Sequence, residues 1–160
     1  VLAPGTGDGV SPQGAPGEAK TMPAAGLSRA QYAAIADFRH ELKRFLVFST
    51  SAASAAGLPS QQHQALLAIA GSEERLSVGA LADRLLVAPH SSAELVTRMI
   101  DAGLVEKSTA PDDRRRMLVA LTPKAEALLG ELTAAHLEEL VRLEPALAAA
   151  LRRLSALRPK

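Results

Sequence analysis

The fold is decided by one stretch, residues 76–129, LSVGALADRLLVAPHSSAELVTRMIDAGLVEKSTAPDDRRRMLVALTPKAEALL. Ser77 can cap a short helix over 78–85, because its hydroxyl can accept a hydrogen bond from the first turn. Pro89 suits the first turn of a second helix, where its missing N–H costs nothing. Only residues 86–88 separate the two, so the stretch predicts two short helices joined by a tight turn.

The hydrophobic period changes after Gly103, which ends the second helix. Residues 104–108 and 117–121 are short β-compatible runs, and 109–116 between them contains a turn signal, Ala-Pro-Asp-Asp. These runs predict a β-hairpin with a basic tip. Two short helices followed by a hairpin make a winged helix-turn-helix, so we expect a mostly α fold with a small β-hairpin wing. In such a unit one helix can enter the major groove of DNA while the hairpin tip reaches the minor groove.

Longer amphipathic helices flank this core. Ser28 and Gln31 have the spacing of a capping box, and the helix that follows, to Gly57, carries one apolar stripe. The stripe contains Ile35, Phe38, Leu42, Phe45, Ser49, Ala52 and Ala56. Helices of this length commonly pair with another helix, for example from a second subunit. After the hairpin, Thr122 and Pro123 start a further helix, and we expect Pro145 to separate it from a last one.

Composition limits the classes of function. The chain has 160 residues, with 18 Lys and Arg against 17 Asp and Glu, and no Cys. We expect one domain over 27–160, preceded by a flexible arm rich in Gly and Pro at 1–26. The absence of Cys excludes disulfides and thiol chemistry. No apolar run is long enough to span a bilayer and no signal peptide is visible, so we expect a cytoplasmic protein that makes no membrane contact.

Catalytic and metal-binding patterns are absent from the sequence. It contains no Gly-x-Ser-x-Gly, no glycine-rich phosphate loop and no His/carboxylate cluster beside a nucleophile. His136 with Glu139 is the best metal candidate, but His136 lies on an apolar stripe, where a core histidine is the simpler interpretation. We therefore expect no enzyme, no bound metal and no cofactor.

The stretch 76–129 resembles the core of the MarR family of bacterial transcriptional regulators. Its most specific pieces are AGLVEK at 102–107, the wing motif Asp113-x-Arg115, and the hairpin exit V-x-L-T-P-K-A at 119–125. The flanking helices also resemble members of this family, so the resemblance extends from about residue 28 to residue 157.

Membership of this family implies a homodimer, with residues 27–57 and 122–160 as dimerisation helices and 60–121 as the winged helix-turn-helix. It implies binding to double-stranded DNA at a pseudo-palindromic operator, with repression as the expected sign of regulation. It also implies modulation by a small ligand.

The resemblance assigns roles to the wing residues. Arg115 matches an arginine that enters the minor groove, and Asp113 matches the carboxylate that orients it; Arg114 and Arg116 flank them as candidate phosphate contacts. On the second short helix the polar candidates for DNA contact are His90, Ser91, Ser92 and Arg98. Glu94 departs from the commonest family pattern, which has an arginine there, although a carboxylate can accept a hydrogen bond from cytosine N4.

A small effector, aromatic or anionic, is expected where the first long helix meets the DNA-binding unit. The candidate ligand-binding residues are Phe38, Arg39, Phe45, Phe48 and His63. The alternative for the three phenylalanines is a plain core role, because rings at helical spacing are most often core.

The charge of the DNA-binding unit leaves a second function open. Between residues 76 and 122 there are six cations and six anions, so this surface is not broadly basic. A winged helix used only for protein interaction or dimerisation, without specific DNA binding, is therefore the alternative. Replacement of Arg115 by alanine distinguishes the two, because only the DNA-binding function needs that side chain.

Overall fold

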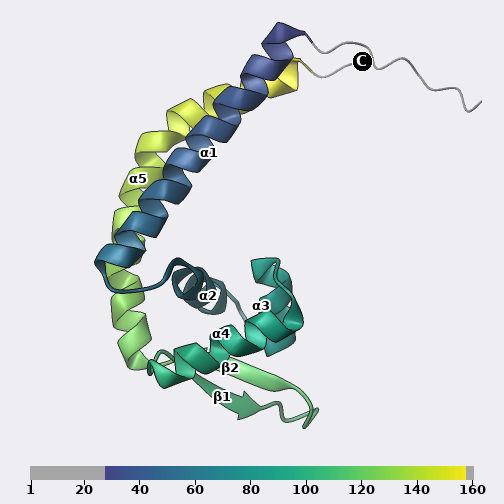
Figure 1. The fold of residues 1–160 in the computed structure, drawn as a ribbon, viewed down its shortest axis with the longest axis vertical. Coiled ribbons are helices and arrows are strands. Elements are labelled where there is room, and N and C mark those ends of the chain that lie inside the picture. Colours follow the sequence, from purple (N-terminus) through teal and green to yellow (C-terminus); the bar gives the residue numbers. More distant parts are fainter. Residues whose placement is uncertain (1–27, 158–160) are drawn as a thin grey trace, which may run out of the picture.

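The computed structural model describes residues 28–157, so the arm predicted at 1–26 lies outside the described residues. A pair of long helices extends from a smaller body that holds the remaining helices and the hairpin (Figure 1). The elements in chain order are α1 (Arg29–Ala55), α2 (Ser60–Ala70), α3 (Val78–Leu85), α4 (Pro89–Asp101), β1 (Val105–Thr109), β2 (Met117–Leu121) and α5 (Pro123–Ala156). The fold is therefore mostly α with a two-stranded wing, as the sequence predicts.

Three predicted helix starts are confirmed by their hydrogen bonds. The Ser28 hydroxyl accepts from the Gln31 N–H at 3.3 Å, and the Gln31 side chain accepts from the Ser28 N–H at 2.7 Å, which completes a capping box. Ser77 caps α3 through the Ala80 N–H at 3.1 Å, and Thr122 caps α5 in the same way. Side chains at these positions satisfy N–H groups that a helix leaves unpaired at its start.

The hairpin pairs Val105 with Leu121 and Thr109 with Met117, in antiparallel register. Its first strand begins at Val105, one residue later than predicted. The N–H of Val119 also donates to the Leu76 carbonyl at 2.9 Å, which attaches β2 to the segment just before α3. The wing is therefore connected to the helix-turn-helix through the middle of β2.

The main hydrophobic core lies between α2, α3, α4, the hairpin and the first half of α5. Its largest buried members include Leu66, Leu81, Leu95, Val96, Met99, Leu104, Val119, Leu129 and Leu132. Every element of the winged unit contributes to it, so α4 and the wing share one packed support.

The long helices α1 and α5 lie antiparallel. Near the end of the pair, Gln31 donates to the Leu157 carbonyl at 2.9 Å and Arg153 contacts Asp37 at 2.8 Å. Closer to the body, Ser49 of α1 meets His136 of α5 at 2.8 Å. The contacts span the length of both helices, so α5 joins the winged unit to the far end of the pair.

The predicted division at Pro145 is wrong, because α5 runs without interruption through that residue. A proline inside a helix removes one hydrogen bond and costs about 3 kcal/mol in an isolated helix. Here Val141, whose carbonyl loses its partner, is 71% exposed, so water can reach this part of the helix. Leu143 before the proline and Ala150 after it are both buried. Packing of that buried side, which α1 covers, keeps the helix continuous.

The predicted apolar stripe of α1 is only partly buried in one chain. The buried residues of α1 are Ala34 and Ala53, which lie beside the predicted stripe, whereas Ile35 and Leu42 of the stripe remain 44% and 42% exposed. The physical reason is that α5 alone covers this helix along most of its length, and it covers only one side. None of the helices in residues 28–157 is both long and apolar enough to cross a membrane.

We expect Thr122→Ala to lower the free energy of unfolding by about 1–2 kcal/mol, because it removes the α5 cap and a hydroxyl that donates to the end of α4. Urea titration at fixed protein concentration measures the change. Thr97→Ala is the matched control, since its hydroxyl only donates to Ala93 one turn back in the same helix. Equal losses in the two variants would contradict the structural role of Thr122.

Candidate nucleic-acid interface

A tight turn sets α4 against α3. Leu86 adopts a left-handed backbone with φ of 55°, and the Val87 N–H donates to the Ala82 carbonyl at 3.1 Å. The Ser92 hydroxyl donates to the Val78 carbonyl at 3.0 Å, and Ser92 is completely buried. Ser92 therefore joins the two helices. The prediction that Ser92 contacts DNA does not hold, because its only polar side-chain atom faces the interior.

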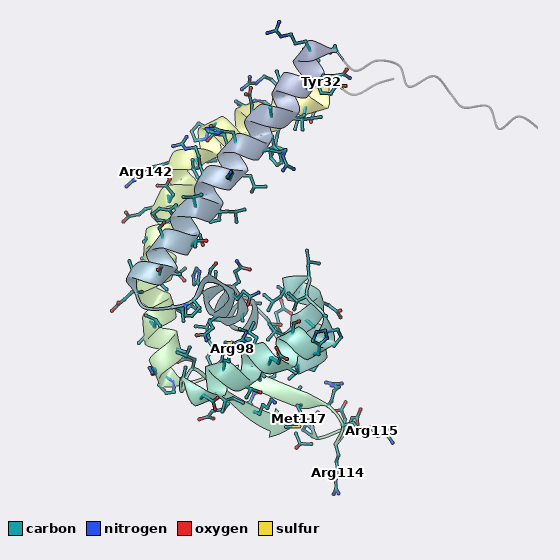
Figure 2. All side chains as sticks on the ribbon, in the orientation of Figure 1. Tyr32, Arg98, Arg114, Arg115, Met117 and Arg142 are labelled. Carbon is teal, nitrogen blue, oxygen red and sulfur yellow. The ribbon has the colours of Figure 1, made fainter. Side chains whose placement is uncertain are left out.

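The other predicted residues of α4 lie on its solvent side. His90 and Arg98 are exposed and Ser91 is partly exposed; Arg98 is marked in Figure 2. Within residues 28–157, none of these three side chains makes a hydrogen bond or an ion pair. They remain available to an external partner. His90 and Ser91 lie in the first turn of α4, and Arg98 lies two turns later.

The wing turn is organised by Asp113, but through the backbone. Its carboxylate accepts the Arg115 N–H at 2.9 Å, and its carbonyl accepts the Arg116 N–H at 3.0 Å. The Ala110 N–H then donates to the Arg116 carbonyl at 2.8 Å, which closes the loop. The structure therefore shows Asp113 shaping the turn that carries Arg115, rather than holding its guanidinium.

Arg114 and Arg115 project from the tip of the wing (Figure 2). Neither guanidinium has a hydrogen-bonding partner among the described residues. Arg116 is different, because it contacts Asp112 at 3.4 Å. Both of those side chains are more than half exposed, so this ion pair contributes at most about 1 kcal/mol and a phosphate could replace it. The wing thus presents two unpaired guanidinium groups and one weakly paired one.

Lys124 is a structural residue that the sequence reasoning missed. Its ammonium donates to the Ala102 carbonyl at 2.8 Å, and the Thr122 hydroxyl donates to the Gly103 carbonyl at 2.8 Å. Both acceptors lie at the end of α4, where carbonyls lack helical partners. The T-P-K sequence at 122–124 therefore attaches the end of α4 to the start of α5. The signal in the sequence was a lysine two residues after the helix cap Thr122, close enough to reach the end of the preceding helix.

A second cluster lies away from the wing, where α1, α2 and α5 meet. The rings of Phe45 and Phe48 contact His136 edge-on, with centroids 6.0 and 5.4 Å away. His63 lies 4.7 Å from the same ring. His136 donates from Nδ1 to the Leu132 carbonyl at 2.6 Å, because a carbonyl can only accept, and this leaves Nε2 as acceptor for the Ser49 hydroxyl in the neutral ring.

His63 is the unusual member of this cluster. It is 1% exposed, and neither ring nitrogen has a hydrogen-bonding partner among the described residues. Burial lowers the pKa of His63 below its usual value, and the nearby His136 lowers it further by Coulombic repulsion. His63 is therefore neutral in the folded protein near pH 7.

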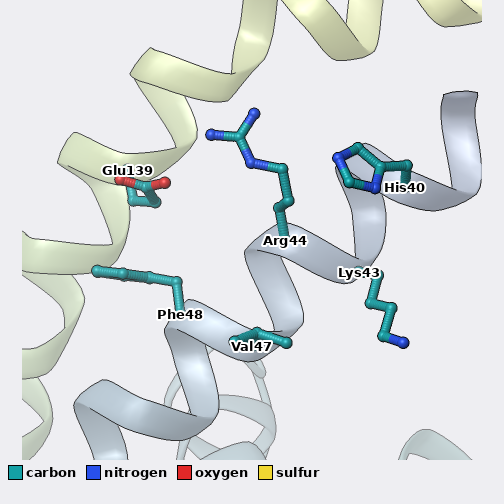
Figure 3. Close-up of a pocket in the computed structure, with 6 residues that line it drawn as sticks. All are labelled: His40, Lys43, Arg44, Val47, Phe48 and Glu139. Atoms are coloured by element: carbon teal, nitrogen blue, oxygen red, sulfur yellow. The ribbon is translucent and has the colours of Figure 1, made fainter.

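The predicted effector residues are divided between two places. Phe45, Phe48 and His63 belong to the histidine cluster, whereas Arg39 is exposed on α1 and Phe38 lies half buried two turns before Phe45. Phe48 also lines an open pocket of about 510 Å³ between α1 and α5 (Figure 3). The pocket is lined by His40, Lys43, Arg44, Val47, Phe48 and Glu139. Its cationic and aromatic groups could accommodate a small anion with an apolar part.

The geometry above defines a winged helix-turn-helix protein. A sequence model of the MarR family matches residues 56–116. Among solved structures, AbsC, a MarR family transcriptional regulator from Streptomyces coelicolor, is 19% identical with a TM-score of 0.65, over 73% of this chain and 80% of that one.

Two further structures with this fold were determined with bound partners. The S. aureus MepR F27L mutant bound to an oligodeoxyribonucleotide is 18% identical with a TM-score of 0.59, over 79% of this chain and 98% of that one. NadR in complex with 4-hydroxyphenylacetate is 24% identical with a TM-score of 0.61, over 71% of this chain and 83% of that one. No curated protein gives a significant match. The resemblance to the MarR family is confirmed over residues 56–116, and the fold of the described residues is the one seen in solved MarR family structures.

We expect His63→Leu to flatten the pH dependence of stability. In the wild type the unfolded chain takes up a proton near pH 6.5, whereas the folded chain resists it, so stability is full above that pH and falls as the pH drops below it. The contribution of one such group is at most about 1.4 kcal/mol per pH unit. Urea titrations between pH 5 and pH 8 measure the slope of the unfolding free energy against pH. This range brackets the ordinary histidine pKa of about 6.5.

The matched control is His40→Leu, at an exposed position of α1. It should leave the slope between pH 5 and 7 in place, while His63→Leu reduces it. A wild-type slope unchanged by His63→Leu would show that the ring is not kept neutral by burial.

Proposed function

We propose that the protein is a homodimeric, sequence-specific DNA-binding transcriptional regulator, most simply a repressor, whose binding is modulated by a small ligand. The observation that carries the proposal is that α4 and the wing tip present unpaired polar and cationic side chains from one rigid support. Helix α4 packs beside β1, at the end of the body away from the free end of the long helices (Figure 1). A helix and a hairpin so arranged can occupy neighbouring grooves of one duplex.

The charge balance determines how such a protein would bind. With six cations and six anions between residues 76 and 122, little affinity can come from general attraction to phosphate. Binding would depend on a few contacts, made by the wing arginines and by the side chains in the first turns of α4. MepR, which shares the fold, was determined with an oligodeoxyribonucleotide, and this supports the same use of the surface here.

The exposed side of the long helices supports dimerisation. Several large apolar side chains of α1 and α5 are exposed to solvent in the single chain: Tyr32, Ile35, Leu42, Leu46, Leu137, Val141 and Leu151. Burying such residues is worth about 25 cal/mol per Å², so a second chain is the simplest cover. Two recognition helices about 34–36 Å apart would then fit successive major grooves of a pseudo-palindromic operator.

The small-ligand part rests on the pocket of Figure 3 and on the histidine cluster beside it. The pocket lies between α1 and α5, and the histidine cluster joins these two helices to α2 of the winged unit, so a bound molecule can favour one relative arrangement over another. A ligand that binds better to a dimer of different spacing would release DNA, by no more than its difference in affinity. NadR, with the same fold, was determined with 4-hydroxyphenylacetate, and we propose an aromatic or anionic effector here.

Arg115→Ala should weaken binding to the preferred duplex about tenfold or more, since a minor-groove guanidinium is lost from each protomer. The slope of log affinity against log salt should fall by about one for each arginine removed. Fluorescence anisotropy at three salt concentrations measures both, with the duplex that the wild type enriches from a random pool and a scrambled duplex of equal length.

Arg142→Ala is the matched control, because Arg142 is an exposed arginine on α5, far from the wing (Figure 2). It removes the same charge and should change affinity little. Unchanged binding by Arg115→Ala would overturn the wing assignment and favour a winged helix that serves only protein interaction.

We expect a solution mass of twice the 16.7 kDa chain, measured by light scattering. Leu46→Glu should shift the mass toward one chain, because it buries a charge in the proposed interface. Leu86→Glu is the control: Leu86 is 92% exposed but lies in the helix-turn-helix turn. A single-chain mass for the wild type at micromolar concentration would contradict the homodimer.

A further inference from the structure

Glu94 occupies the middle of the outward face of α4. The buried residues of this helix are Ser92, Leu95, Val96 and Met99. At 100° per residue, the opposite side of the helix is centred on His90, Glu94, Thr97 and Asp101. Arg98 and Ser91 fall to one side of this line. The side chain that points most directly away from the core in the second turn of α4 is therefore a carboxylate.

This carboxylate is not used within the protein. Glu94 is exposed and makes no hydrogen bond or ion pair with any residue of 28–157. Arg98, one turn later, would be a natural partner at i,i+4 spacing, yet the two do not pair. Thr97 beside it is occupied, because its hydroxyl donates to the Ala93 carbonyl at 3.0 Å. Glu94 is thus a free acceptor at the centre of the recognition face.

A role in stabilising the helix start does not account for Glu94. Favourable interaction of an acidic residue with the helix dipole is confined to the first turn. Glu94 is the sixth residue of α4, whose first turn contains no acidic residue. The unpaired N–H groups of the helix start lie before it.

The chemistry of the major groove limits what a carboxylate can accept there. Guanine offers only the acceptors N7 and O6, and thymine offers the acceptor O4 and a methyl group, so both repel it. Adenine offers one donor, N6, directly beside the acceptor N7. Cytosine offers the N4 donor without an adjacent acceptor on its own ring, and is the base with which Asp and Glu pair.

We propose that Glu94 is a specificity-determining residue that accepts a hydrogen bond from cytosine N4 at one position in each half of the operator. This inference rests on the DNA-binding function proposed above and adds the identity of a base pair to it. Phosphates on either side of the groove repel the carboxylate, so a duplex that lacks the cytosine gains nothing to offset this repulsion. Glu94 therefore selects by weakening binding to the wrong sequence as well as by favouring the right one.

The experiment is selection from a random duplex pool by the purified full chain, followed by titration of single-base variants of the enriched duplex. The wild type should enrich a two-fold symmetric sequence with cytosine at one position in each half. Glu94→Gln should reduce the preference for that cytosine about tenfold or more. It should also raise affinity for scrambled DNA, because one negative charge is lost.

Asp101→Asn is the matched control. It removes the same charge from the same face of α4, about 10 Å further along the helix, and Asp101 is likewise exposed. We expect it to raise affinity for all duplexes alike and to leave the base preference unchanged.

The outcomes separate this inference from the function on which it rests. If the wild type enriches no sequence, DNA recognition itself fails. If it enriches one and Glu94→Gln enriches the same one with unchanged base preferences, DNA binding stands and the role of Glu94 is overturned. Equal effects of Glu94→Gln and Asp101→Asn, or loss of all binding by Glu94→Gln, would also overturn it.

Discussion

The attachment of α4 to α5 is the constraint on which the remaining geometry depends. The last carbonyls of α4 accept from Thr122 and Lys124, and Thr122 at the same time caps α5. The recognition helix, the inner end of the wing and the start of the longest helix are therefore fixed to each other within a few residues. Every group that faces outward from α4 or from the wing inherits its position from this junction.

Local signals in the sequence were sufficient for most of the elements. Ser28, Ser77 and Thr122 are helix caps whose effect operates within one turn, so their helices could be predicted from neighbouring residues. Pro145 could not be judged in the same way. Whether a proline ends a helix depends on what packs beside it, and α1, which lies beside it, is far away in the sequence. Tertiary packing overrides local preference at this point.

The candidate interface likewise contains residues that local sequence could place and residues that it could not. The wing arginines could be placed from the hairpin pattern and its motif, because a tip residue is exposed whatever the rest of the chain does. Ser92 required knowledge of how α4 packs on α3, since its spacing alone does not show which side faces the Val78 carbonyl. The meeting of His63 with His136 joins residues far apart in the chain. No local pattern predicts such a contact.

The unbroken course of α5 has a mechanical consequence. At 1.5 Å per residue, its 34 residues form a rod about 50 Å long. A rod of that length amplifies small rotations: a turn of about 4° at the far end displaces the near end by about 3.5 Å, close to the spacing of one base-pair step. A hinge at Pro145 would absorb such a rotation. Because the helix continues through the proline, a tilt at the free end of the long helices is transmitted to the winged unit, and under the proposed function it becomes a shift in register along the duplex.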